Sequence, residues 1–192
     1  MRKLIRECAD RCALVAVYSN PIYPESFSLG YIIGMDNDHV ILQAYDKIFH
    51  ISIITERVDS IYGIEVDSPY LRKFASSLPK EFQDSIKKAV SARGKQGLLF
   101  QEMRSAKEKD DVISVELFHN DWIKTIILTG RIERLSKSIV TIEQITSKGE
   151  SGGKYSCSFE DIRGFRRNDL GDLRRYRRYL KKRESCDTAT GK

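Results

Sequence analysis

The sequence predicts a mainly β fold with helices: two five-stranded small β-barrels, each with flanking helices, joined by a helical linker. Two observations predict it. Apolar and polar residues alternate over short segments, as in half-buried strands. The pattern of residues 12–46 also recurs without a gap at 112–146, so the chain carries one unit twice, near 12–66 and 112–166.

The first copy is expected to begin with a helix over residues 3–10, which places Leu4, Ile5 and Cys8 on one side. The polar run Asp36-Asn37-Asp38 between two alternating segments is typical of a hairpin turn. Strands of the first copy are expected at 13–17, 30–32, 40–42, 49–55 and 58–61.

The second copy is expected to follow the same order after a helix over residues 101–109. Gly130 repeats Gly30 at the centre of a strand, where a sharp bend suits a small closed barrel. The offset grows to 104 at the last strand, which predicts a longer Gly- and Ser-rich turn at 147–154. Strands are expected at 113–117, 130–132, 140–142, 155–159 and 162–165.

A helix is predicted after each barrel. Ser68-Pro69 is a start signal for a helix over 70–78, and Asn168-Asp169 is a cap for a helix over 170–183. Pro79 separates the first of these from a further linker helix over 80–92, and the tail from 184 is expected to be disordered. The predicted domains are 1–66 (first barrel with its N-terminal helix), 67–100 (helical linker), 101–168 (second barrel) and 169–192 (basic C-terminal helix and tail).

The outward positions of the two copies differ in polarity. The second copy has the polar residues Ser114, Glu116, Arg131, Glu133, Thr141 and Glu143 at these positions, and the first copy has Leu14, Ala16, Tyr31, Ile33, Ile41 and Gln43, of which only Gln43 is polar apart from the hydroxyl of Tyr31. Burial of one apolar side chain gains about 1.5–3 kcal/mol, so the outer face of the first copy is expected to be covered. The cover is either the linker helices of the same chain or a protein interface with a partner or second copy. The second barrel is expected to face solvent.

The positive charge is concentrated near the C-terminus. The net charge is +6, but residues 163–183 hold ten basic and two acidic residues, a local +8 that leaves −2 for the rest of the chain. Guanidinium groups pair with phosphate oxygens, and tyrosine rings stack on exposed bases. The predicted nucleic-acid-binding residues are Arg163, Arg166, Arg167, Arg174, Arg175, Tyr176, Arg177, Arg178, Tyr179, Lys181, Lys182 and Arg183.

Two other interpretations of this basic segment exist. The helix could dock by its apolar edge of Leu170, Leu173 and Leu180, with its arginines solvated or paired with acidic residues of the rest of the chain. An anionic membrane surface is disfavoured, because the apolar edge is short and the segment from 170 to 183 has no Trp or Phe.

No catalytic constellation is apparent, so neither an enzyme nor a cofactor is predicted. The cluster Asp36-Asn37-Asp38-His39 could suggest catalysis or a metal site, but Asp and Asn are also the residues that a tight turn favours. The four cysteines lack the paired spacing of a zinc site and are expected to be free thiols. His39 and His50 have no nucleophile or carboxylate set around them, and no phosphate-binding glycine loop is present.

The localisation expected from the sequence is cytoplasmic. Charged residues interrupt the first seven positions before a secretory apolar region can form. No stretch approaches the roughly 18 consecutive apolar residues of a membrane span, so no membrane partner is expected.

The order of elements resembles the Sm-like (Lsm/Hfq-type) small β-barrel of the bacterial type: a helix, five bent strands, a Gly in the second strand and a polar turn before the third. The segment Gly30–Asp36 is similar to the family's first motif, in which a Gly precedes an Asp by six positions. Ile162-Arg163-Gly164 is similar to the Ile-Arg-Gly of its second motif. The chain departs from the family at Asn37, which comes too early for the base-reading Asn, and at Ser136, which replaces the Asp.

The resemblance implies a non-enzymatic RNA-binding or RNA-associated protein. Because Sm-like proteins form rings of six or seven barrels, it also implies self-association, for instance three copies in a pseudo-hexamer, with a monomer as the alternative. The departures at Asn37 and Ser136 keep the family's base-reading pocket from being transferred to this chain. The alternative function is a protein-protein interaction or scaffold module that uses the apolar outer face of the first barrel.

Overall fold

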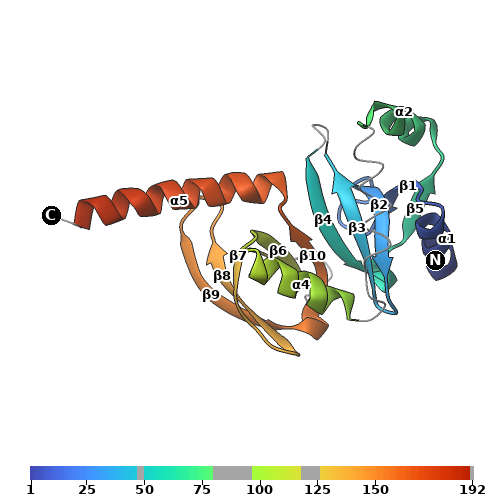
Figure 1. Ribbon diagram of the computed structural model, residues 1–192. Coiled ribbons are helices and arrows are strands. Elements are labelled where there is room, and N and C mark those ends of the chain that lie inside the picture. The colour runs from blue at the N-terminus through green and yellow to red at the C-terminus, as the bar shows by residue number, and fades with distance from the viewer. Residues whose placement is uncertain (47–49, 80–96, 118–125, 191–192) are drawn as a thin grey trace. The chain divides into compact units, whose positions relative to one another are not determined.

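The computed structural model describes residues 1–46, 50–79, 97–117 and 126–190, with side chains as far as Ser185 in the last helix. The chain forms two compact units, Met1–Leu99 and Phe100–Lys192 (Figure 1). The linker helix predicted over 80–92 lies outside the described residues. Each unit is mainly β with flanking helices, as the sequence predicts.

The first unit is a five-stranded antiparallel sheet with strand order β5-β1-β2-β3-β4. A 3-10 turn, η1, lies between β4 and β5 along the chain. Its elements are α1 (Arg2–Asp10), β1 (Leu14–Tyr18), β2 (Ser28–Met35), β3 (His39–Tyr45), β4 (Ile51–Arg57), η1 (Val58–Ser60), β5 (Gly63–Val66) and α2 (Pro69–Ser77).

The second unit repeats this order, with its last strand beside its first: β10-β6-β7-β8-β9. Its elements are α4 (Leu98–Glu108, whose first two residues lie in the first unit), β6 (Ile113–Leu117), β7 (Ile126–Leu135), β8 (Ile139–Ile145), β9 (Ser151–Ser158), η2 (Phe159–Asp161), β10 (Ile162–Arg167) and α5 (Leu170–Thr190).

The two second strands bend at the same place. The pairing register shifts between Ile32 and Gly34 in the first unit and between Ile132 and Arg134 in the second, which marks a β-bulge at equivalent positions. Gly30 and Gly130 lie two residues before these register shifts. A Cβ at either position would overlap a carbonyl oxygen of the neighbouring strand. Only glycine therefore allows this close approach of the two strands.

The repeat is more regular than the sequence indicated. Of residues 58–61, expected as the fifth strand, Val58–Ser60 form the 3-10 turn η1, and the strand follows at Gly63–Val66. The expected long turn at 147–154 is also wrong, because β9 already begins at Ser151. Five residues separate β3 from β4, as they do β8 from β9, and one extra residue enters at the register shift between Glu143 and Ile145. The offset is therefore 101 from this bulge to η2, not 104.

The predicted closure into barrels is not seen in the described strands. In each unit the backbone hydrogen bonds run through the five strands in the order given and do not join the last strand in that order back to the first. Each unit is thus described as an open, bulged antiparallel sheet.

Both faces of the first sheet are covered within the chain. The inner face packs on Ile5 and Cys8 of α1. The outer face packs on Leu71, Leu78 and Leu98, which come from α2, the residue after it and the start of α4. The predicted interface residues Leu14, Tyr31, Ile33 and Ile41 are all buried in this outer cluster. Their prediction as an exposed protein interface is therefore corrected, and the alternative of packing within the chain is the one observed.

The outer face of the second sheet is not left to solvent as expected, because α5 lies on β7 and β8 (Figure 1). This helix also continues to Thr190. The prediction of a disordered tail from residue 184 is therefore wrong for residues 184–190, which extend the helix by about two turns.

Candidate nucleic-acid interface

Helix α5 is fixed to the second unit by its first turns. The cap predicted at Asp169 is confirmed, since its Oδ1 accepts a hydrogen bond from the backbone N–H of Gly171 at 2.8 Å. Leu170 and Leu173 are half-buried, whereas Leu180 is exposed. The early turns therefore hold the helix to the sheet, and the later ones present their side chains to solvent.

The contact between α5 and the sheet is polar. The hydroxyl of Ser114 donates to Asp172 Oδ2 at 2.7 Å and lies 2.7 Å from the hydroxyl of Thr129. Arg175 Nη1 donates to Thr129 Oγ1, also at 2.7 Å. Ser114 and Thr129 are buried, and a buried hydroxyl without a partner would cost about 1–3 kcal/mol. The hydrogen bonds thus specify the position of the helix.

A second polar contact lies one residue further along α5. Arg131 Nη1 donates to the hydroxyl of Tyr176 at 3.0 Å, and its guanidinium carbon is 5.8 Å from the centre of that ring. Arg131 also pairs with Asp110. The ring of Tyr179 stacks on Tyr176 at 6.1 Å between centroids, with 20° between the planes. Both tyrosines, predicted to stack on bases, are half-buried and contact groups of their own unit.

Asp172 is the half-buried carboxyl group of this contact. Burial raises the pKa of Asp172 above its ordinary value, and the neighbouring Asp169 adds to the rise. The hydrogen bond from Ser114 and the charge of Arg175 lower the pKa in part. Burial has the largest effect, so the ionised form of Asp172 is held in the folded unit at a cost.

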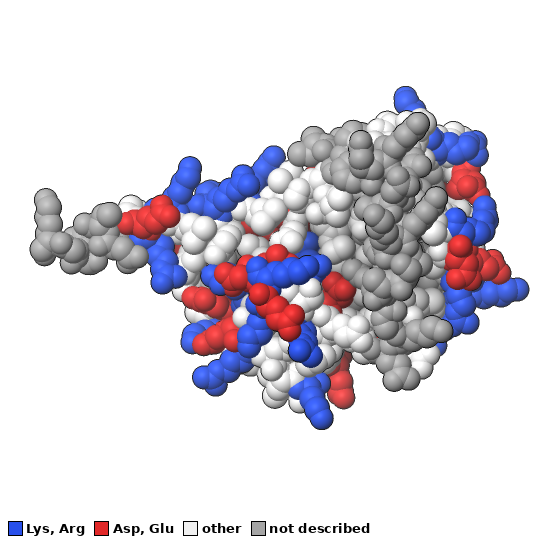
Figure 2. Space-filling view, in the orientation of Figure 1, with Lys and Arg blue, Asp and Glu red and all other residues white. Residues whose placement is uncertain are grey.

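The solvent-exposed side of α5 carries cations. Arg174, Arg177, Arg178 and Lys181 follow one another at helical spacing and are exposed, and we call them the basic face of α5. None of the four has a carboxylate partner among the described residues. Beside them, Lys182 pairs with Glu150 at 2.8 Å. Figure 2 shows the Lys and Arg atoms gathered along this helix.

The remaining predicted cations are not all available to a ligand. Arg163 is buried and lies 3.6 Å from Glu116. Arg167 lies 3.7 Å from both Glu102 and Asp111. Arg166 is half-buried and Arg183 exposed. The contacts of Arg163 and Arg167 lie within the second unit, and the low exposure of these two side chains removes both residues from the predicted surface.

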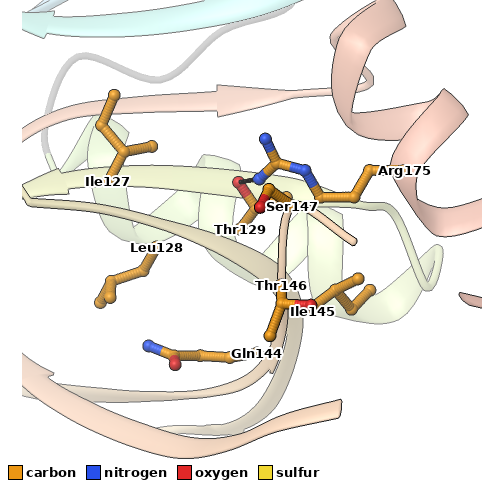
Figure 3. Close-up of a pocket in the computed structure, with 8 residues that line it drawn as sticks. All are labelled: Ile127, Leu128, Thr129, Gln144, Ile145, Thr146, Ser147 and Arg175. Carbon is orange, nitrogen blue, oxygen red and sulfur yellow. Dashed lines mark hydrogen bonds between the residues drawn. The ribbon is translucent and has the colours of Figure 1, made fainter. Parts of the chain in front are cut away.

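A pocket of about 380 Å³ opens between the sheet and α5 (Figure 3). Its lining comes from three places in the second unit. Ile127, Leu128 and Thr129 belong to β7, and the end of β8 and the turn after it follow, with Arg175 reaching in from α5. The other lining residues are Gln144, Ile145, Thr146 and Ser147. This pocket was not among the predicted sites, because no local sequence pattern connects its strand residues to the helix.

The same three sheet positions contact the following helix in both units. Leu14, Leu29 and Tyr31 lie in the outer cluster of the first unit, and 100 positions later the sequence has Ser114, Thr129 and Arg131. On the helices, Leu71, Phe74 and Ala75 of the first unit correspond, 101 positions later, to Asp172, Arg175 and Tyr176. Asp67 and Asn168, with φ of 56° and 59°, precede the helices at the same offset. An apolar contact in one copy is thus a hydrogen-bonded contact in the other.

The residues that could have suggested catalysis serve the turns. Asp36 Oδ1 accepts the backbone N–H of Asp38 and of His39 at 2.9 and 2.7 Å. Its Oδ2 accepts the N–H of Leu98 at 2.9 Å. The backbone N–H of His50 donates to Asp46 Oδ1 at 2.9 Å. The predicted hairpin turn is therefore confirmed.

Metal ligation finds no support in the described part of the chain, where no three His, Cys, Asp or Glu side chains gather as a set of ligands. Cys8, Cys12 and Cys157 are free thiols, as expected. Within the same residues, no helix combines the length and the apolar character needed to cross a membrane.

Comparison with known proteins gives no relative: no family model matches the chain, and no curated protein or solved structure matches it significantly.

Proposed function

We propose that this chain is a non-enzymatic RNA-binding or RNA-associated protein of the cytoplasm, with phosphate contacts from the basic face of α5. One observation carries the proposal: Arg174, Arg177, Arg178 and Lys181 are exposed on one side of a helix without a carboxylate partner in the described residues. Clustered cations of this kind attract phosphate groups and release the counterions that surround the nucleic acid.

The polar contact beneath the helix supports this proposal. Hydrogen bonds from Ser114 and Arg131 to Asp172 and Tyr176 fix how α5 lies on the sheet. The basic face therefore keeps a constant direction, and its cations are presented as an ordered row. An ordered row loses less conformational freedom on binding than cations on a mobile segment.

We further propose that the units are of the Sm-like type. Each unit has a helix before five antiparallel strands, a glycine in the second strand and a polar turn before the third. This is the order on which the resemblance rests. The identical bulge in β2 and β7 bends both sheets at the same point, as a small barrel requires.

A filter-binding or anisotropy assay with labelled single-stranded RNA of about 12 nucleotides tests the proposal, since one small domain covers about 4–16 nucleotides. Four phosphate contacts give a slope of log affinity on log salt near −3 for a single strand. Between about 50 and 200 mM salt the affinity of the wild-type chain should then fall about fiftyfold.

The decisive variant is Arg174/Arg177/Arg178/Lys181→Ala, which should lose both the binding and its dependence on salt. Arg175 is kept, because its side chain holds Thr129. The matched control is Arg2/Lys3/Arg6/Lys73→Ala, which removes four exposed cations from the first unit. Equal binding by the two variants would contradict the assignment of the interface to α5.

A further inference from the structure

Aromatic rings gather beside the loop that joins β1 to β2 in the first unit. Five rings form a continuous path, with 5.5–6.5 Å between the centroids of neighbours, and we call them the aromatic surface: Tyr62, Tyr18, Phe27, Tyr70 and Phe74. Phe27, Tyr62 and Tyr70 are exposed, as are Ile22 and Tyr23 of the loop. Exposed apolar side chains that adjoin one another mark an interaction surface, whereas single ones are common on any protein.

Hydrogen bonds hold the loop that carries part of this surface. The hydroxyl of Tyr62 lies within hydrogen-bonding distance of the carbonyl oxygens of Asn20 and Pro24, at 3.2 and 3.0 Å. Asn20 Oδ1 accepts the backbone N–H groups of Ile22 and Tyr23 at 3.0 and 3.4 Å. The loop is therefore ordered before a partner binds, which removes part of the entropic cost of association.

The charges at the aromatic surface disfavour a nucleic acid as its partner. Glu25 is the only charged residue from 18 to 35, and Glu65 Oε2 accepts the hydroxyl of Tyr18 at 2.9 Å. Lys73 follows Tyr70 by three positions on α2, so these three charged side chains sum to −1. An RNA strand needs cations for its phosphates, and the described residues group them on α5 instead. The charges therefore fit a partner that is uncharged or basic.

The rings and their hydroxyls fit a proline-rich segment. Neighbouring rings are tilted by 37–76°, so they present edges as well as faces to the side chains of a partner. The hydroxyls of Tyr23 and Tyr70 have no hydrogen-bond partner among the described residues and can donate to a carbonyl oxygen. A polyproline II segment has its carbonyl groups free, because it makes no internal hydrogen bonds. Surfaces lined by aromatic side chains bind such segments in several kinds of domain.

We infer that the aromatic surface binds a proline-rich segment of a partner protein, in which a basic residue beside the prolines pairs with Glu25. The prolines pack on Phe27 and Tyr70, and the tyrosine hydroxyls donate to carbonyl oxygens of the segment. A proline-rich segment is already extended in solution, so it loses little conformational freedom on binding. This site lies in the first unit and is independent of the RNA binding proposed for α5.

Fluorescence anisotropy with two labelled peptides tests this site. Each peptide has about ten residues, or three turns of polyproline II, followed by an arginine; the residues are prolines in one peptide and alternate glycine and serine in the other. The wild-type chain should bind the proline peptide and not the glycine-serine peptide. Phe27→Ala and Tyr70→Ala should bind the proline peptide about tenfold more weakly, as expected when an anchoring aromatic side chain is lost.

Two further variants separate the rings from the charge. The matched control is Tyr155→Ala in the second unit, which should keep the wild-type affinity, because Tyr155 is 39% exposed and Phe27 40%. Glu25→Gln should weaken binding about threefold, the size of one exposed ion pair. It should have no effect on binding of a proline peptide that lacks the arginine.

Failure of the wild-type chain to bind the proline peptide overturns the assignment of this partner. Loss of a dimer in Phe27→Ala and Tyr70→Ala, measured by light scattering, would then assign the aromatic surface to a second copy of the chain, and loss of oligouridine binding would assign it to bases. Equal binding of the two peptides by the wild-type chain, or unchanged affinity for the proline peptide in both variants, also overturns it.

Discussion

Gly149 tests whether the turn between β8 and β9 positions α5. Its φ of +71° lies in the left-handed region, and a Cβ placed on it would be 2.9 Å from Arg178 Cβ and 3.1 Å from the backbone N of Tyr179. Gly153 has φ of +81° but would meet no atom within 4 Å. Gly149→Ala and Gly153→Ala therefore share the backbone strain and differ in the clash with the helix.

The size of the effect follows from these two terms. Left-handed backbone costs an alanine about 1–2 kcal/mol, which is the whole expected loss for Gly153→Ala. The clash adds about 1–3 kcal/mol for Gly149→Ala, because the helix backbone must move. Urea unfolding followed by circular dichroism measures both losses, and amide hydrogen exchange should show weaker protection of α5 in Gly149→Ala alone. Equal losses and equal protection in the two variants would refute the reasoning.

Three further predictions concern single side chains. Burial raises the pKa of Asp172, so the wild-type chain should gain stability relative to Asp172→Asn as pH falls from 7 toward 3.8. Urea unfolding at several pH values measures the stability difference between the two chains, and a difference that stays constant with pH contradicts the prediction. Ser68 Oγ accepts the N–H of Leu71 at 3.2 Å, so Ser68→Ala should destabilise the chain by about 1 kcal/mol in urea unfolding and Ser68→Thr by less; equal losses would argue against the cap. Burial raises the pKa of the Cys157 thiol to about 11, so a thiol reagent at neutral pH should modify the partly exposed Cys12 before Cys157. Mass spectrometry measures the two rates, and equal rates would show that the Cys157 thiol is accessible.

The sequence predicts the strands well where side chains alternate and poorly where another spacing produces a similar pattern. Alternation at Val15, Val17, Val40 and Leu42 marks strands that the structure confirms. Val58 and Ile61 are three residues apart and were interpreted as a strand. That spacing also places two side chains on one side of a 3-10 turn, where both are buried in the core. The wrong fifth strand then forced the wrong offset of 104.

The candidate site was predicted in part for a similar reason. The cluster of arginines and lysines near the C-terminus is a local signal, and it placed the basic face of α5. The burial of Arg163 by Glu116 and of Arg167 by Glu102 depends on tertiary contacts that composition does not encode. A usable signal for the polar contact did exist, because Leu14 is replaced by Ser114 and Tyr31 by Arg131 in the repeat. This signal is found only when the helices of the two copies are aligned at an offset of 101 and the strands at an offset of 100.

The change from apolar to polar contact also explains why the two copies can differ in function. In the first unit Leu71 and Phe74 hold α2 by burial, which is strong but leaves no cation in place. In the second unit the equivalent positions hold Asp172 and Arg175, and burial of Asp172 raises its pKa, which is a cost to stability at neutral pH. An apolar contact would fix the helix without this cost. What the polar contact adds is Arg175, an ordered guanidinium between the pocket and the basic face, so the second unit is where we place RNA binding.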